Sequence, residues 1–511
     1  MTRKSVHSRK QIVAILLLLT VVFGCSSKRT SLPESVLADK IRGGWAGQII
    51  GCAYGGPTEF KYFGMIPDSV TIRWNGDEVR WYFDNMVGMY DDVYMDLSFL
   101  ATLDRYGFSA PADSFAVSFA RAGYPLWHAN QAARRNILDG LLPPQTGFWK
   151  NNPHSDDIDF QIESDFAGLV SPGRPDVAAE ICEKVGHIMC SGDGWYGGLF
   201  VATMYSLSFV CDTPLEIVRG ALSALPEGTR YHEAVATVLS QYEENQEDWK
   251  EAWRLVNESF GEDVGCPRGV LDGYDIDAVL NGAYVAIGLL YGEGDFGRSI
   301  EIATRCGQDS DCNPSTVGGI LGTLHGFNAI PPIWRDAMEG CGDLEFPYTG
   351  ISFEKACLIT EMLARETIDN HGGRMSKKRV LSWRKTSPKP APFEQNFSKL
   401  RYNGKLQIRR NLEWGQEDSI SFEGSGLVLR YSFGGKTDAL QDYSAEVEVS
   451  LDSEAPDTVF LPAAFERRRL ELFFRYDLYD SEHNLRVRWL NPVPELDVKL
   501  GDLILYKKDE T

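Results

Sequence analysis

The chain has 511 residues and a formal net charge of −21 at pH 7, with 43% hydrophobic, 12% aromatic and 24% charged residues. This composition is typical of a soluble globular protein, and the length predicts two or more domains. Because nucleic-acid phosphates are bound chiefly by Lys and Arg, the acidity argues against a nucleic-acid partner. The ten cysteines show no paired Cys-x-x-Cys spacing, so they indicate neither a zinc site nor a disulfide framework, although a disulfide stays possible.

The first 25 residues have the features of a bacterial lipoprotein signal. Four basic residues precede an apolar run from residue 12 to residue 23, which at about a dozen residues is too short to cross a bilayer. The sequence Val-Phe-Gly-Cys that ends at Cys25 resembles a lipobox, which makes Cys25 the lipidation site; an ordinary buried or removed cysteine is the alternative. No acidic surface-export tag follows. We therefore expect an envelope protein that meets the membrane only through its lipid anchor and faces the periplasm rather than the cell surface.

Two segments carry glycines at four-residue spacing. They are Gly43, Gly47, Gly51 and Gly55 in the first, and Gly318, Gly322 and Gly326 in the second. This spacing places the glycines on one helix face, where a second backbone can approach closely. Because each interior glycine costs a helix roughly 0.5–1 kcal/mol relative to alanine, we predict that the two helices pack against each other beneath a site.

Carboxylates lie at the ends of these helices. Glu59 follows the first glycine helix, Asp309 and Asp311 lie in the loop before the second, and Asp91 and Asp92 fall at the start of a third helix. A solvated loop residue is the alternative for Glu59, and N-terminal capping is the alternative for the Asp pair. Mg²⁺ prefers several oxygen ligands, and crowded carboxylates are costly without a cation. Together these acids predict a metal-binding site.

These motifs, in this order, resemble those of the ADP-ribosylglycohydrolase family. Similar stretches occur at residues 159–163, 172–175, 191–198 and 281–285, so the resemblance covers about residues 35–370. It implies an all-α fold with a binuclear magnesium site, Mn²⁺ being a possible substitute. It also implies an enzyme that removes ADP-ribose from modified side chains or related acceptors.

The resemblance also implies roles for individual residues. Four carboxylates become metal ligands: Asp91, Asp92, Asp309 and Asp311. Glu59 matches the family's glutamate near the scissile bond, so we assign it acid or base catalysis, with Asp309 as a second catalytic carboxylate. Four residues are candidate substrate contacts: Asp193, Gly194 and Tyr196 on a glycine-rich loop, and Asn313, which is also a candidate oxygen donor. A plain tight turn is the alternative for that loop.

Three positions depart from the pattern that the resemblance implies. Tyr90 and Cys312 stand where family members commonly carry Thr, and Val93 replaces another frequent Thr. A thiol suits magnesium poorly, so one metal is expected to be weaker, different or absent. Three functions stay open: hydrolysis of ADP-ribosyl or related glycosides, hydrolysis of glycans on the same fold, and glycan binding without catalysis. A basic groove able to hold a diphosphate favours the first, and an open acidic groove with exposed aromatic residues favours the second.

The C-terminal part changes character. Residues 374–396 are basic and then Pro-rich, which predicts a linker, and residues 397–511 alternate with period two, which predicts a β-sandwich. This sandwich is similar to the jelly-roll modules attached to carbohydrate-active enzymes. Four aromatic residues are candidates for sugar stacking or for the core: Trp414, Tyr476, Tyr479 and Trp489. We therefore predict a multidomain protein with a signal at 1–25, an all-α catalytic domain at 26–373, a linker at 374–396 and an all-β domain at 397–511.

Overall fold

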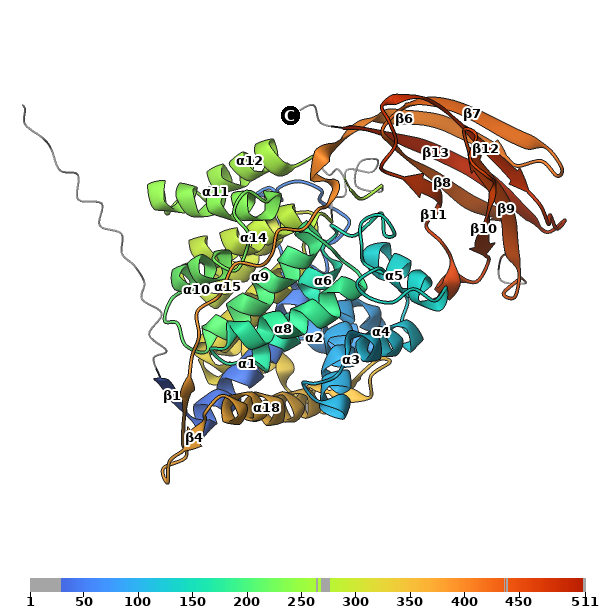
Figure 1. The fold of residues 1–511 in the computed structure, drawn as a ribbon. Helices are drawn as coiled ribbons and strands as arrows, with labels where there is room; N and C mark the ends of the chain where they lie inside the picture. Colours follow the sequence, from blue (N-terminus) through green and yellow to red (C-terminus); the bar gives the residue numbers. More distant parts are fainter. Residues whose placement is uncertain (1–28, 263–264, 268–275, 436, 438–439, 509–511) are drawn as a thin grey trace, which may run out of the picture.

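The structure is a computed structural model that describes residues 29–262, 265–267, 276–435, 437 and 440–508. The predicted signal peptide and Cys25 lie outside these residues. Figure 1 shows a helical body with a β-sandwich at one end. Within the described ranges, no helix combines the length and the apolar character needed to cross a membrane.

The helical body accounts for most of the chain before residue 371. Its α-helices are α1 (Glu34–Gly55), α2 (Glu78–Asn85), α3 (Asp91–Tyr106), α4 (Ala112–Arg121), α5 (His128–Leu138), α6 (Asp159–Ile162), α7 (Asp165–Leu169), α8 (Pro175–Val185), α9 (Asp193–Ser208), α10 (Pro214–Leu222), α11 (Arg230–Glu244), α12 (Trp249–Phe260), α14 (Ala278–Tyr291), α15 (Phe296–Arg305), α16 (Cys312–His325), α17 (Pro332–Arg335) and α18 (Phe353–Asn370). The hydrophobic residues of these helices form one continuous core.

The helices α1 and α16 pack backbone against backbone, as their glycines predict. A Cβ added at Gly47 would lie 2.0 Å from the carbonyl oxygen of Gly318, and one at Gly43 would lie 2.0 Å from that of Gly322. Because Gly43 meets Gly322 while Gly55 meets Ser310, the helices run antiparallel. The C-terminal end of α1 therefore meets the N-terminal end of α16, where the predicted acids lie.

The third glycine of the second stripe has another role. The helix α16 ends at His325, and Gly326 follows it with φ of +91°, a conformation that glycine adopts without steric cost. Gly326 therefore terminates the helix rather than extending the packed face.

The segment predicted as a linker connects the two domains, but it is packed along its length. β5 (Val380–Arg384) pairs with β1 (Arg29–Pro33) and with β4 (Arg374–Met375) in one antiparallel sheet. Residues 385–396, which we call the strap, then cross the helical body to the sandwich (Figure 1). The backbone N–H of Thr386 donates to Gly173 (3.1 Å), and that of Ala391 donates to Ala224 (2.9 Å). Composition identified a segment without helix; it did not reveal these contacts.

The C-terminal domain is a jelly roll, which confirms the predicted fold class. Its strands are β6 (Leu400–Asn411), β7 (Glu417–Gly424), β8 (Gly426–Gly435), β9 (Ser444–Leu451), β10 (Asp457–Pro462), β11 (Glu471–Arg475), β12 (Ser481–Trp489) and β13 (Leu496–Lys508). One sheet has the order β11-β8-β13-β6 and the other β10-β9-β12-β7, all antiparallel. The first strand thus pairs with the last, the second with the next to last, and so inward, as a long hairpin rolled into two sheets does.

Side chains of both domains join them. Trp149 of the helical body packs with Tyr476 and Tyr506 of the sandwich in a buried cluster. Lys150 pairs with Asp477 at 2.9 Å. Of the four aromatic candidates for sugar stacking, Tyr476 and Trp489 are buried, whereas Trp414 and Tyr479 are exposed.

Candidate active site

The predicted acids of three helix ends line one cavity of about 490 Å³. Its acidic wall carries Glu59, Asp91, Asp309 and Asp311, together with Cys312. The rest of the lining is Phe60, Met86, Gly88, Met89, Met95, Trp127, His128, Asn130, Asp159, Ile158, Ile162, Glu163 and Ile276. The antiparallel contact of α1 with α16 brings Glu59 next to the Asp pair, and the start of α3 supplies Asp91.

The loop before α16 is built to concentrate acceptor atoms. Gly307 turns the chain with φ of +81°, and a Cβ there would lie 2.1 Å from the carbonyl oxygen of Gly64. One ligand atom each from Asp309, Asp311 and Cys312 lies within 4.8 Å of the others. Asp92 is buried behind this group rather than lining the cavity, and it accepts a hydrogen bond from the Cys312 thiol at 3.2 Å.

The electrostatics of this wall fit a bound cation. Burial, and then the charges of Asp311 and Asp309, raise the pKa of Glu59. Burial and the neighbouring carboxylates also raise the pKa of Asp92 and of Asp311. One oxygen of each of Asp92, Asp309 and Asp311 is buried without a hydrogen bond. Unpaired buried carboxylate oxygens are costly, and a divalent cation with oxygen preference would satisfy them.

Tyr90 and Cys312, two of the three positions that depart from the expected pattern, lie in different surroundings. Tyr90 points into the core, where its hydroxyl donates to the carbonyl of Val79 at 2.9 Å, so it offers the cavity no oxygen. Cys312 does face the cavity. Burial and the charges of Asp309 and Asp311 raise the pKa of its thiol, so Cys312 keeps its proton and donates to Asp92.

The predicted substrate contacts do not line the cavity. Asp193 and Gly194 begin helix α9 instead of lying on a loop. Asp193 accepts from the amide of Asn396 at 2.6 Å, and the Tyr196 hydroxyl donates to the carbonyl of Pro392 at 3.0 Å. Asp193 and Tyr196 therefore hold the strap, whereas Gly194 lies against the backbone of Ser155.

Asn313 lies beneath the acidic wall rather than in it. Its side-chain amide donates to the side chain of Asn281 at 2.8 Å, and its backbone N–H donates to the carbonyl of Asp309 at 3.1 Å. Asn313 thus helps to position the acidic loop.

The sequence reasoning missed the opposite wall of the cavity. Asn130 donates through its side chain to Glu163 and through its backbone N–H to Asp159 at 3.0 Å. Burial and the charge of Asp159 raise the pKa of Glu163. Both acids belong to the 159–163 stretch that resembles the family, so a signal was present, but their place in the cavity was not predicted.

A second cavity of about 510 Å³ adjoins the first, and both domains line it. Trp127 and His128 line both cavities, and the side chain of Trp127 is 40% exposed. The sandwich contributes basic groups to the second cavity: Arg430, Arg468 and Arg469. Burial and the positive charge of Arg135 lower the pKa of Arg469. The acidic cavity thus adjoins one that carries three arginines together with Glu471.

The solved structures that resemble this chain include two with low overall similarity. A structure described as an "ADP-ribosylglycohydrolase-related protein complex" is 17% identical with a TM-score of 0.40, covering 65% of this chain and 99% of that one. Another, the GH115 4-O-methyl-alpha-glucuronidase BtGH115A with specificity for decorated arabinogalactans, is 11% identical with a TM-score of 0.18, covering 65% of this chain and 42% of that one. A search of curated proteins found no match. The model of the ADP-ribosylglycohydrolase family matches residues 33–416, and the chain therefore belongs to this family of hydrolases that act on glycosyl bonds.

Proposed function

We propose that the protein is a metal-dependent hydrolase that cleaves the glycosidic bond of an anionic, ADP-ribosyl-like substrate outside the cytoplasm. The observation that carries the proposal is the junction, at Trp127, of a carboxylate-lined cavity with an arginine-lined one. A substrate whose sugar lies in the first cavity can place a diphosphate in the second.

The acidic wall would hold Mg²⁺, in two sites, with Mn²⁺ as a substitute. The ligands would be Asp91, Asp92, Asp309 and Asp311, and the unpaired oxygens of the last three support the assignment. When bound, such an ion polarises sugar oxygens and lowers the pKa of water. Glu59 lines the same cavity, where burial raises the pKa of its carboxyl and so favours a proton that the leaving group could take. Asp309 lines the same cavity and would be the second carboxylate that glycoside hydrolysis generally requires.

The arginines would recognise the anionic part of the substrate. Guanidinium groups bind phosphate oxygens with two parallel hydrogen bonds, and Arg430 and Arg469 flank the cavity from β8 and from the segment before β11. Trp127 offers an exposed ring on which a sugar or base can stack. The second candidate is a glycan; the exposed Trp414 and Tyr479 of the jelly roll favour it.

We also propose that Cys25 carries the lipid anchor and that the enzyme faces the periplasm. The basic, apolar and lipobox segments of residues 1–25 support this location. A glycan-binding protein without catalysis would share the location but would need no metal.

The test is calorimetric titration of the full-length protein in detergent with Mg²⁺ and Mn²⁺. We expect binding that disappears in the double variant Asp309→Ala, Asp311→Ala. The matched control is Asp104→Ala with Asp113→Ala, two exposed acids outside the cavity lining, and this control should bind as the wild type does. Wild-type protein that binds neither ion would overturn the metal-dependent proposal and favour a glycan-binding function.

A further inference from the structure

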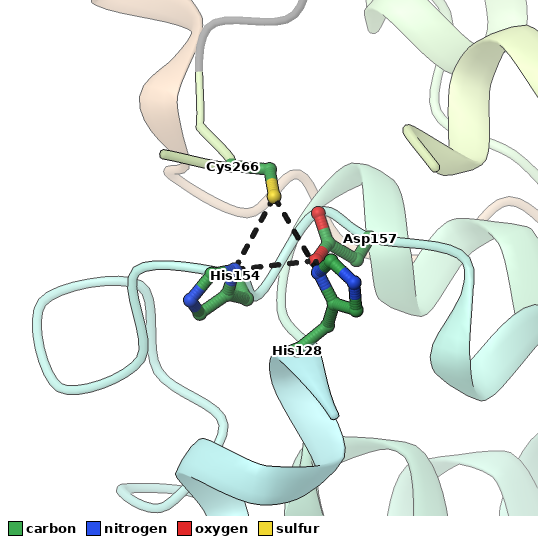
Figure 2. Close-up of side chains that lie close together, drawn as sticks. All are labelled: His128, His154, Asp157 and Cys266. Carbon is green, nitrogen blue, oxygen red and sulfur yellow. Dashed lines mark hydrogen bonds and ion pairs between the residues drawn. The ribbon is translucent and has the colours of Figure 1, made fainter. Parts of the chain in front are cut away.

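A second group of side chains that could bind a metal lies beside the wall that the two cavities share. Figure 2 shows the side chains of His128, His154, Asp157 and Cys266 converging on one point. His128 opens α5, His154 and Asp157 lie in the segment before α6, and Cys266 lies in the segment before α14. One nitrogen, oxygen or sulfur atom from each lies within 4.8 Å of all the others.

The distances are those of a tetrahedron of ligands around one ion. The Nδ1 atoms of His128 and His154 lie 3.3 and 3.4 Å from Oδ2 of Asp157. The same two nitrogens lie 3.7 and 3.3 Å from Sγ of Cys266. Tetrahedral Zn²⁺ with ligands at about 2.0–2.3 Å requires edges of roughly 3.3–3.6 Å between them.

Burial of Asp157 is the second observation that points to an ion. Its side chain is 0% exposed, and both of its carboxylate oxygens are buried without a hydrogen bond of normal geometry. The groups nearest to its Oδ2 include the two imidazole Nδ1 atoms, at 3.3 and 3.4 Å. Ligands of a shared cation have this arrangement, because each points to the centre rather than to its neighbour.

The outer side of His154 supplies a third observation. Its Nε2 lies 2.8 Å from Oε1 of Glu471, a buried residue at the start of β11 in the sandwich. When Nε2 carries the proton for this hydrogen bond, the lone pair of Nδ1 faces the cluster. Histidines that bind metals are generally oriented by a carboxylate in this way.

The backbone of His128 also serves this convergence. Its φ is +46°, a region that residues with a side chain adopt rarely. Such strain persists where the surrounding structure imposes it, commonly at ligand sites. Nδ1 of this residue lies 3.3 Å from Oδ2 of Asp157 and 3.7 Å from Sγ of Cys266.

We propose that His128, His154, Asp157 and Cys266 form a structural zinc site that joins the helical body, the segment with Cys266 and, through Glu471, the sandwich. Nitrogen and sulfur donors select Zn²⁺ over Mg²⁺, so this site is chemically distinct from the carboxylate wall. Four protein ligands leave no position for substrate, which makes the ion structural. Because His128 lines both cavities, the ion fixes the wall between them.

The experiment measures zinc in the full-length protein, purified in detergent through a tag without histidine. Elemental analysis should find about one zinc per chain in the wild type. Cys266→Ser and His154→Gln should each lose most of it, whereas the matched controls Cys211→Ser and His371→Gln should keep it. Cobalt substituted into the wild type should show a thiolate-to-metal absorption band that Cys266→Ser lacks.

Two further readouts keep the result decisive. Circular dichroism of each variant shows whether zinc is lost from a folded protein, and Asp309→Ala with Asp311→Ala should retain zinc while it loses Mg²⁺ or Mn²⁺. Wild-type protein that takes up neither zinc nor cobalt after reconstitution overturns the proposal. Full zinc content in folded Cys266→Ser also overturns it, whatever happens at the carboxylate wall.

Discussion

At the scale of single residues, Cys312 stands where the sequence analysis expects a threonine. The thiol lies in the lining of the acidic cavity at the start of α16 and donates to Asp92. A hydroxyl at this position could both donate to Asp92 and face the ions. The wild-type site is therefore expected to hold magnesium less tightly than a site with Thr.

We predict that Cys312→Thr tightens Mg²⁺ binding by a factor on the order of 10, the size of effect that groups around a metal site commonly have. The reason is that a hard cation prefers oxygen to sulfur nearby. Calorimetry of the variant beside Cys211→Thr, a half-buried cysteine outside the cavity lining, measures the change. Equal affinities in wild type and Cys312→Thr would show that this side chain does not face the ion.

Sequence predicted one wall of the cavity and missed the other. The glycine spacing of two helices predicted a site at their ends, and the acids found there are Glu59, Asp309 and Asp311. Trp127 and Asn130 carry no such mark, because their role arises only where α5 meets the cavity. The proposed zinc site could not be predicted from the sequence either, because its ligands come together only in the fold. Cys266 is 112 residues from His154 in the chain, and no motif surrounds either residue.

At the scale of elements, the pair α1 and α16 sets the geometry of the acidic wall. Its contact is made by backbone atoms, with a Cβ at Gly51 falling 2.0 Å from the carbonyl oxygen of Pro314. This packing could be predicted, since glycines that recur on one face of a helix mainly serve close approach of a second backbone. The contacts of the strap could not be predicted in this way. A proline-rich composition favours an extended backbone but does not say which residues of the helical body it packs against.

We predict that Gly47→Ala destabilises the protein by roughly 1–3 kcal/mol, the cost of forcing extra volume into a packed interior. The added methyl group would overlap the backbone of Gly318, which cannot rotate away as a side chain can. Urea unfolding compares this variant with Gly64→Ala, where an added Cβ meets no described atom within 4 Å. Similar midpoints for the two variants would contradict the close contact of the helices.

The strap should hold less firmly as pH rises. Burial disfavours the charged form of His187, but the hydrogen bond and charge of Glu394 outweigh it and raise its pKa. Protons are then bound more tightly in the docked state. The stabilisation is fully present below the unfolded pKa of about 6.5 and is lost as pH rises through the higher folded value.

We expect the hydrogen bond between His187 and Glu394 to stabilise the docked strap by roughly 1.5–3 kcal/mol at low pH, as buried hydrogen bonds to charged groups do. Hydrogen exchange of residues 385–396, corrected for intrinsic rates, measures it across pH 5 to 9, about the range in which a raised histidine titrates. The pH dependence should vanish in His187→Gln and persist in His371→Gln. If the hydrogen-exchange protection of the wild-type strap instead rises with pH, the proposed role of protonated His187 is wrong.

At the scale of the whole molecule, the jelly roll and the helical body line one cavity together. Arg430 and Arg469 come from the sandwich, yet they line a cavity that shares Trp127 with the acidic one. Alternation along the strands predicted the sandwich, but its rolled strand order and its docking on Trp149 depend on contacts far apart in the chain.

We predict that Arg430→Ala raises KM for diphosphate-containing substrates by roughly tenfold or more, since a charge-assisted hydrogen bond contributes about 1.5–3 kcal/mol. Binding of Mg²⁺ and hydrolysis of neutral glycosides should not change. Steady-state kinetics beside Arg410→Ala, an exposed arginine paired with Asp418, provides the comparison. An equal loss on neutral and anionic substrates would assign Arg430 a structural role and favour glycans as substrates.

The short strand β1 has a mechanical consequence. It pairs with β5 from Arg29 opposite Arg384 to Pro33 opposite Val380, and α1 begins at the next residue. If Cys25 is anchored, any pull from the bilayer reaches the protein first through this ladder. A pull along β1 loads the hydrogen bonds between β1 and β5 together rather than one after another. The β1–β5 pair would therefore resist the force before it reaches the packed helices α1 and α16 and the acidic wall.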